Sequence, residues 1–251
     1  MIDPIVAALT IAAFLLGGFV KGAIGLGLPV VVLALLALIM PLREAMAIFL
    51  IPGIASNIWQ ATSGPWIKPL VGRLWAFLLG SAAGIVLGVW IMAGTRSDIM
   101  ALVLGVLLAV YSVYSLIAPR MPEPGRREAW MSPAMGASGG VFFGMAGLFI
   151  VPGLLYLETL RLPRDQFVQG LGITFLTITT TLAVSMTGFN LVSWDLALIS
   201  ALGLIPVFIG IWAGRRIRHR ISEAFYRKLF FIALLVTGVY MVVKTVLTGT
   251  I

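Results

Sequence analysis

The stretch GGFVKGAIGLGLPV, residues 17–30, places five glycines, one proline and a single lysine, Lys21, inside a long apolar run. No other titratable residue lies between Pro4 and Pro41. As one helix, this run would be about 57 Å long at about 1.5 Å per residue, which is too long for one membrane crossing. Glycine and proline interrupt helices, so we expect the chain to turn within this stretch.

The composition is that of an integral membrane protein. Of 251 residues, 61% are hydrophobic and 10% are charged, and the mean hydropathy is +1.10. Soluble domains carry about 25% charged residues. Apolar stretches long enough to span a bilayer as helices recur along the chain, and we therefore predict an all-α polytopic membrane protein. These stretches are residues 70–93, 98–117, 165–187, 194–214 and 224–247.

Charge and cysteine content exclude several other classes. The first apolar run begins with Asp3, where a cleaved signal peptide would be basic, so we expect this run to be retained. The absence of cysteine excludes disulfides, thiolate metal sites and cysteine nucleophiles. The net charge of +8 comes from basic residues in short loops between apolar spans, which is the positive-inside pattern and does not indicate nucleic-acid binding.

The sequence repeats itself. GGFVKGAIGL at 17–26 matches GGVFFGMAGL at 139–148, with glycine at four matching places and a proline following each segment. Further along, GIVLG at 84–88 matches GIWAG at 210–214. Matches that keep one order at a nearly constant offset indicate two homologous halves.

The two halves define the domain organisation. We predict a first repeat at 1–118, a cytoplasmic linker at 119–130 and a second repeat at 131–251, all within one transmembrane domain. Each repeat would consist of a glycine-broken helical hairpin followed by three transmembrane helices. A hairpin enters and leaves on one side, so each repeat crosses an odd number of times and the two repeats are inverted.

The distribution of basic residues favours this arrangement. We take the basic segment at 215–228 as cytoplasmic; the hairpins then leave only Arg43, Arg96 and Lys244 outside. In the alternative, each glycine-rich segment crosses the membrane once. The excess of basic residues on the cytoplasmic side is then smaller, because five of them move to the outside. These five are Lys68, Arg73, Arg120, Arg126 and Arg127.

The glycine-rich segments are the candidate binding site. Irregular backbone at membrane depth is tolerated only where it is packed in protein or lines a cavity, and broken helices of transporters bind substrate near the midplane. Helix N-termini and Lys21 both favour an anion. Four glycines would let backbone approach it: Gly22, Gly25, Gly144 and Gly147.

Two interpretations of Lys21 stay open. Its charge could face the cavity, or its long stem could carry the ammonium to an interface. The second half has Phe143 at the equivalent position, so the two repeats differ at the site.

Polar residues in the next span of each half extend the candidate site. Hydroxyls and amides suit an oxyanion because they bind it without neutralising it. The alternative is hydrogen bonding between helices, which contributes about 0.6 kcal/mol on average in membranes. The candidates are Ser56, Asn57, Gln60, Gln169, Thr174 and Thr177.

The remaining motifs have simpler explanations. We assign the glycines at 80–88 and 210–214 to close helix packing, because small residues four apart let helices approach. His219, among arginines, is expected to be solvated. Every acidic residue lies near the end of a predicted span or in a loop, so we expect no catalytic residues, no metal, no cofactor and no enzymatic activity.

The chain resembles the sulfite exporter TauE/SafE family, also called TSUP. The resemblance is carried by GGFVKGAIGLGLP, by GGVFFGMAGLFIVP and by GIWAGRRIRHRIS, and it covers essentially the whole chain. It implies a bacterial inner-membrane permease for sulfur-containing anions, such as sulfite, sulfoacetate or other organosulfonates, often for their export.

These observations predict a secondary transporter that exports small sulfur-containing anions by alternating access around the two hairpins. Its partners would be a small anionic substrate and the lipid bilayer, without nucleic acid, and a homodimer is allowed. Both termini would be periplasmic. The alternatives are a permease for another small anion, carboxylate or inorganic, and a membrane assembly protein that transports nothing.

Overall fold

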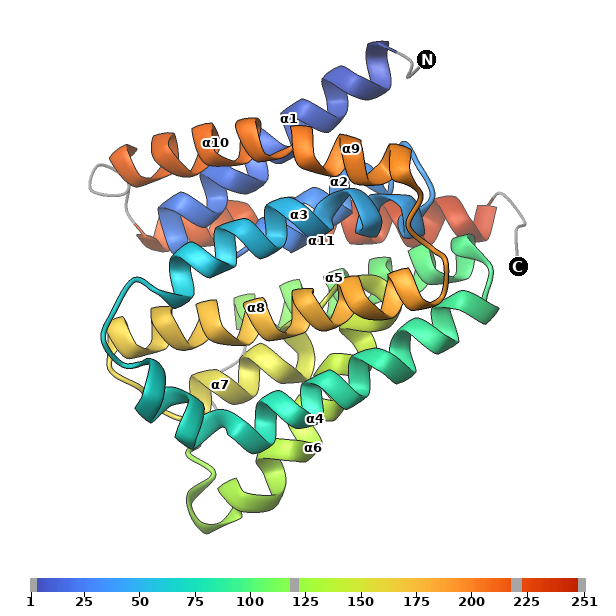
Figure 1. The fold of residues 1–251 in the computed structure, drawn as a ribbon. Coiled ribbons are helices and arrows are strands. Elements are labelled where there is room, and N and C mark those ends of the chain that lie inside the picture. The colour runs from blue at the N-terminus through green and yellow to red at the C-terminus, as the bar shows by residue number, and fades with distance from the viewer. Residues whose placement is uncertain (1–3, 118–121, 218–222, 248–251) are drawn as a thin grey trace. The chain divides into compact units, whose positions relative to one another are not determined.

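The computed structural model describes residues 4–117, 122–217 and 223–247, and this part of the chain contains helices and no strand (Figure 1). Residues 119–121 of the predicted linker lie outside the described residues, as does residue 118. Residues 218–222, which include His219, also lie outside them.

The helices follow the predicted spans closely. In chain order they are α1 (Pro4–Ile24), α2 (Leu28–Leu36), α3 (Leu42–Ala61), α4 (Ile67–Gly94), α5 (Ser97–Ile117), the 3-10 turn η1 (Gly125–Arg127), α6 (Glu128–Ala146), the π-helical η2 (Ile150–Leu154), α7 (Leu155–Thr159), α8 (Arg164–Gly188), α9 (Trp194–Leu202), α10 (Leu204–Ile217) and α11 (Glu223–Leu247).

Five helical stretches of the described chain are long and apolar enough to cross a membrane. They are α1, α4, α5, α8 and the continuous run Trp194–Ile217 formed by α9 and α10. Four of the five predicted stretches are among them; the fifth is α11, whose most apolar part is the shorter Phe231–Thr245. The prediction of an all-α polytopic membrane protein is confirmed.

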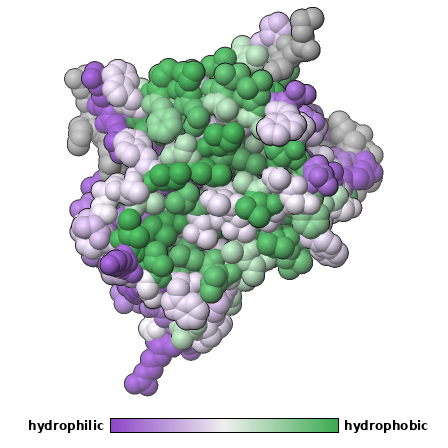
Figure 2. Space-filling model, viewed as in Figure 1, coloured by the Kyte–Doolittle hydropathy of each residue, from purple (hydrophilic) through white to green (hydrophobic). Residues whose placement is uncertain are grey.

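The outer faces of these helices carry apolar side chains, as contact with lipid requires. On the face shown in Figure 2, hydrophobic residues cover α9 and α10, where Leu202, Ile205 and Ile209 are all more than half exposed.

The first glycine-rich segment breaks where the glycines predict. Helix α1 ends at Ile24, and Gly25 and Gly27 have φ of +91° and +103°, which L-residues with side chains rarely adopt. Helix α2 then packs back on α1: a methyl group at Gly17 would lie 2.7 Å from the Val32 side chain. The arms are unequal, with 21 residues in α1 and 9 in α2.

The second glycine-rich segment breaks in the corresponding place. Helix α6 ends at Ala146, and its C-cap Gly147 has φ of +73°. The chain returns through η2 and α7, and a methyl group at Gly139 would lie 3.0 Å from the backbone of Gly153. Both predicted breaks are therefore present.

The described chain forms two compact units. The first unit comprises Met1–Pro52, Arg96–Ala118 and Val192–Ile251, and the second comprises Gly53–Thr95 and Pro119–Leu191. Each unit takes helices from both predicted repeats, so the repeats interleave. The repeat boundaries at 1–118, 119–130 and 131–251 stay a prediction.

In the first unit, α1 and α10 pack in backbone contact. Methyl groups at Gly18 and Gly22 would overlap the backbone carbonyls of Val207 and Ile211 on α10. The residue numbers rise together, so the two helices run parallel. Gly210 and Gly214 lie equally close to α1, as the packing interpretation of GIWAG predicts.

In the second unit, α4 and α6 pack in the same way. Gly140 and Gly144 lie against the backbone carbonyls of Ser81 and Ile85 on α4. Gly140 and Gly144 are the repeat equivalents of Gly18 and Gly22. Their partners on α4 match Val207 and Ile211 at the offset that relates GIVLG to GIWAG. Equivalent glycines therefore make equivalent contacts in the two units.

Helices α5 and α11 form a third close pair, in the first unit. Gly105 lies against the backbone of Gly238, at 3.0 Å from an added methyl to the Gly238 oxygen, and the Tyr111 and Phe231 rings meet at 5.1 Å. The residue numbers on one helix rise as those on the other fall, so α5 and α11 run antiparallel.

A pair of substitutions in α4 tests the glycine packing. Gly84→Ala would push its methyl into the Ala137 carbonyl, and we expect a loss of about 1–3 kcal/mol of stability. Gly72→Ala in the same helix meets open space and should stabilise by up to about 1 kcal/mol. Thermal unfolding in detergent measures both. Equal stability of the two variants would contradict the packing role.

Candidate functional site

Lys21 lies in the last turn of α1, just before the break. Its side chain is only 8% exposed, and its carbonyl oxygen accepts a hydrogen bond of 2.7 Å from the Gly25 N–H. A lysine that snorkels along a lipid-facing surface would be exposed, so this burial favours an interior position. Its role in binding an anion stays a prediction.

The tip of the first hairpin leaves backbone N–H groups available. The first N–H groups of a helix have no partner within it. Helix α2 begins after Gly27, which offers no side-chain acceptor, and Pro29 stands in its first turn. A methyl group at Gly25 would meet nothing within 4 Å. The tip therefore combines a positive helix end with open space beside the turn.

The predicted glycines divide into packing and turning residues. Gly22 and Gly144 lie inside the α1–α10 and α4–α6 contacts, and each is buried. Gly25 and Gly147 have positive φ and form the turns. Their contribution to substrate binding stays a prediction in all four cases.

Gln169 holds the turn between α3 and α4. Its side-chain nitrogen, Nε2, donates to the carbonyl oxygens of Ala61 at 2.8 Å and Gly64 at 2.6 Å, and its Oε1 accepts from the Trp66 N–H at 3.1 Å. Both N–H bonds of the amide are thus used by backbone. This fully buried side chain bonds the backbone that follows α3. It therefore has a structural role in addition to the predicted role in substrate binding.

The other predicted polar residues of α3 and α8 also have partners. Asn57 Nδ2 donates to Thr179 Oγ1 at 3.4 Å, and Gln60 Nε2 donates to the Val168 carbonyl at 3.0 Å. Ser56 and Thr177 donate to backbone carbonyls within their own helices, at 3.1 and 3.0 Å. Interhelical hydrogen bonding thus accounts for Asn57 and Gln60 without a ligand, and their place in a substrate site stays a prediction.

Thr174 is the exception among these residues. It is fully buried in α8, and its Oγ1 has no hydrogen-bond partner in the part of the chain that the structure describes. Buried hydroxyls are rarely left unpaired, because the desolvation cost is about 1–3 kcal/mol. Thr174 is therefore the hydroxyl in the second unit best placed to receive a water or a ligand.

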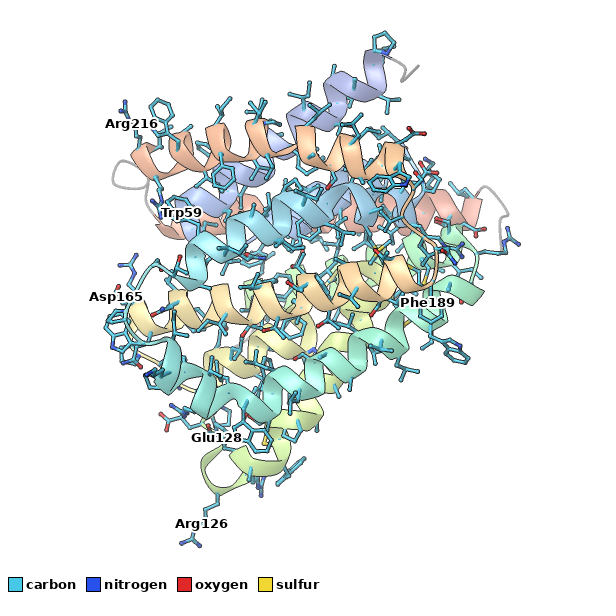
Figure 3. All side chains as sticks on the ribbon, viewed as in Figure 1. Trp59, Arg126, Glu128, Asp165, Phe189 and Arg216 are labelled. Carbon is cyan, nitrogen blue, oxygen red and sulfur yellow. The ribbon has the colours of Figure 1, made fainter. Side chains whose placement is uncertain are left out.

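Acidic residues lie at helix ends. Glu44, Asp98, Glu128, Asp165 and Asp195 each occupy the first turn of a helix, where they complement its dipole. Figure 3 shows Asp165 and Phe189 at opposite ends of α8. Among the described residues, no group of three or more His, Asp or Glu could hold a metal ion.

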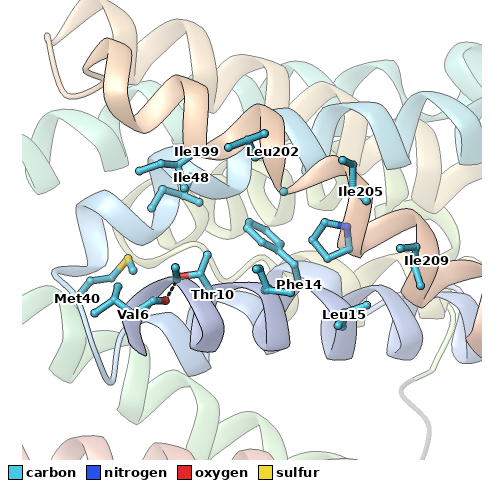
Figure 4. A pocket seen from close by; sticks show the side chains of 14 residues that line it. Val6, Thr10, Phe14, Leu15, Met40, Ile48, Ile199, Leu202, Ile205 and Ile209 are labelled. Carbon is cyan, nitrogen blue, oxygen red and sulfur yellow. Dashed lines mark hydrogen bonds between the residues drawn. The ribbon is translucent and has the colours of Figure 1, made fainter. Parts of the chain in front are cut away.

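An apolar groove of about 450 Å³ lies in the first unit between α1 and the α9–α10 run (Figure 4). Its lining includes Phe14, Ile48 and Ile205, and the hydroxyl of Thr10 at its edge donates to the Val6 carbonyl at 2.7 Å. No charged side chain lines it. The groove therefore offers nothing that would bind an anion.

Sequence reasoning missed two features of the second unit. Thr179, the partner of Asn57, lies in the threonine run of α8 but was not distinguished from its neighbours. The Phe149 ring packs between the arms of the second hairpin, against Gly139 and Gly153, and meets Phe143 at 6.2 Å and Phe175 at 6.1 Å. In the sequence, the FF pair at 142–143 and Phe149 indicate an aromatic cluster, but their spacing alone does not show that their rings meet.

The fold and these sites define a multi-pass α-helical membrane protein with two glycine-broken helix pairs and a buried lysine beside one break. The family model described as Sulfite exporter TauE/SafE matches residues 9–241, and the chain belongs to this family of membrane transporters. Comparison with curated proteins and with solved structures finds no match. The family predicted from the glycine motifs is confirmed.

Replacing Gln169 tests its structural role. Gln169→Leu leaves the Ala61 and Gly64 carbonyls and the Trp66 N–H without their partner, and we expect a loss of at least about 1–3 kcal/mol of stability. Thr181→Val, which removes only a bond to a carbonyl one turn back, is the control and should change little. Thermal unfolding in detergent compares the two variants. A Gln169→Leu variant as stable as the native protein would contradict the structural role of Gln169.

Two isosteric changes in α8 test Thr174. Thr174→Val removes a buried hydroxyl without a described partner, so we expect unchanged or slightly higher stability without substrate. Thr179→Val deprives Asn57 of its acceptor and should cost about 0.5–1.5 kcal/mol. If Thr174→Val costs as much as Thr179→Val, the Thr174 hydroxyl is already bonded, for instance to water.

Proposed function

We propose that this protein is a secondary transporter that exports small sulfur-containing anions such as sulfite, sulfoacetate and other organosulfonates. The observation that carries the proposal is the buried lysine, Lys21, beside the glycine break of α1 in a member of the TauE/SafE family. A buried charge in a membrane span is costly and usually serves a pathway.

The chemistry of the first hairpin supports an anion of this size. Lys21 supplies a full positive charge, and the N-terminus of α2 supplies partial charge and backbone donors. Sulfite and sulfonates present three oxygens around sulfur, which accept several hydrogen bonds at once. Gly25 and Gly27 place no side chain between the turn and the anion.

The acidic residues support a mechanism driven by charge. The described carboxylates in the first turns of helices lie away from mid-span, whereas proton or sodium coupling commonly uses an embedded carboxylate or histidine. A membrane potential that is negative inside favours anion exit by about 2.3 kcal/mol per charge per 100 mV. We propose uniport or anion exchange, with alternating access to the bound anion.

We also propose that the two halves are inverted repeats in the inner membrane, with the linker cytoplasmic and both termini periplasmic. Two observations support this. Equivalent glycines make equivalent helix contacts, and α5 and α11, which match in the repeat, pack antiparallel. A twofold axis in the membrane plane relates helices in this way.

The first test is electrogenic uptake into proteoliposomes of sulfite, sulfoacetate and the matched dicarboxylate malonate. We expect sulfoacetate and sulfite currents that exceed the malonate current. We expect Lys21→Gln to abolish them because it removes the buried charge, and Lys68→Gln, which removes an exposed charge, to leave them unchanged.

Four results would count against the proposal. A larger malonate current would point to a carboxylate permease, and no flux of any anion would point to an assembly role. Proton movement with the anion would exclude uniport. Undiminished sulfonate flux in a folded Lys21→Gln variant would remove Lys21 from the site.

A further inference from the structure

The two hairpins, which the sequence repeat makes equivalent, differ at their tips. Lys21 of the first hairpin corresponds to Phe143 of the second in the alignment of GGFVKGAIGL with GGVFFGMAGL. Both side chains are buried, at 8% and 0% exposure. The same scaffold position therefore holds a charge in one unit and an aromatic ring in the other.

Aromatic rings pack between the arms of the second hairpin. Phe149, directly after the turn, is 1% exposed. Its ring meets Phe143, Phe77 and Phe175 edge to face, with centroids 6.2, 5.7 and 6.1 Å apart. Edge-to-face contacts of this kind stabilise aromatic pairs beyond the effect of burial alone. Gly147 at the turn is itself buried, so this hairpin offers less open space at its turn than the first.

The returning backbone of the second hairpin fits this packing. Leu154 N–H donates to the Phe149 carbonyl at 3.2 Å, the π-helical bond of η2. π-helical turns often mark functional sites, but here local packing explains the turn. Pro152 has no N–H to donate. Gly153 lies under the Phe149 ring, and a methyl group added at Gly153 would be 2.6 Å from that ring. The α-helix that follows, α7, has only 5 residues.

The first hairpin has the opposite character. Its returning arm α2 is an α-helix of 9 residues that begins directly after the turn, so its free N–H groups lie at the tip. Gly25, Leu26 and Ile24 are partly exposed, whereas their equivalents Gly147, Leu148 and Ala146 are buried. A methyl group at Gly25 would meet no atom within 4 Å. This tip has open space, and Lys21 lies one turn away.

We infer that the two hairpins have different roles. The α1–α2 hairpin alone binds the transported anion, whereas the α6–η2–α7 hairpin is a closely packed element that stabilises the second unit. The inference rests on the proposed function for the identity of the anion. It replaces a site shared by two equivalent tips with an asymmetric one, in which Phe143 and Phe149 have displaced the binding chemistry from the second repeat.

The chain contains no cysteine, so single cysteines can report on each tip without further engineering. Leu26→Cys and Leu148→Cys are a matched pair at equivalent positions of the repeat. The full-length purified protein is treated with 2-sulfonatoethyl methanethiosulfonate, a thiol reagent that is itself a small sulfonate. Sulfoacetate is the protecting anion, because sulfite would react with the reagent.

We expect Leu26→Cys to be labelled at least about tenfold faster than Leu148→Cys, since thiol reaction rates follow access. Sulfoacetate should slow labelling of Leu26→Cys only. Ile24→Cys and Ala146→Cys form a second matched pair if either leucine variant fails to fold. Phe149→Leu should lower the unfolding temperature and leave the KM for sulfoacetate within about twofold, because truncating a packed ring costs stability.

The outcomes separate this inference from the proposed function. Equal labelling of the two cysteines, or protection of Leu148→Cys by sulfoacetate, overturns the division of roles even when the native protein transports sulfoacetate. A large rise in KM in a stable Phe149→Leu variant overturns it too. Absence of both sulfite and sulfoacetate flux in the native protein overturns the proposed function, whatever the labelling shows.

Discussion

The structure depends on one constraint: inside hydrocarbon, backbone polar groups must be bonded or packed within the protein, so a helix can break only where neighbouring chain covers the break. Glycine stripes meet this constraint. They let α10 lie against α1, and α4 against α6, at the distance of backbone contact. Each broken helix therefore has a continuous helix beside it. The breaks at Gly25 and Gly147 lie within one or two helical turns of these glycine contacts.

The same scaffold carries different chemistry in the two units. In the first, it holds a lysine and an uncapped helix N-terminus beside open space. In the second, it holds a set of packed phenylalanines. The two hairpins thus share one packing arrangement, and side chains at a few positions make them chemically different.

Function follows from where charge is placed. Carboxylates lie in the first turns of helices, many described basic residues lie near helix ends, and Lys21 is a buried charge within a described span. A carrier of small anions needs this arrangement, because an embedded carboxylate would repel the substrate. Membership of the TauE/SafE family agrees with such a carrier. The burial of Lys21 adds a specific residue to that general description.

Much of this was predictable from sequence, because hydrophobic length and helix-breaking residues act locally. The spans, both breaks, the packing glycines and the family all follow from local patterns such as GGFVKGAIGLGLP and GIWAG. Spacing shows which face of a helix is small or polar, but not which helix covers it. Only the tertiary structure decided that α1 pairs with α10, that Gln169 clamps the α3–α4 turn, and that the Phe149 ring meets Phe175, because these contacts join residues far apart in the chain.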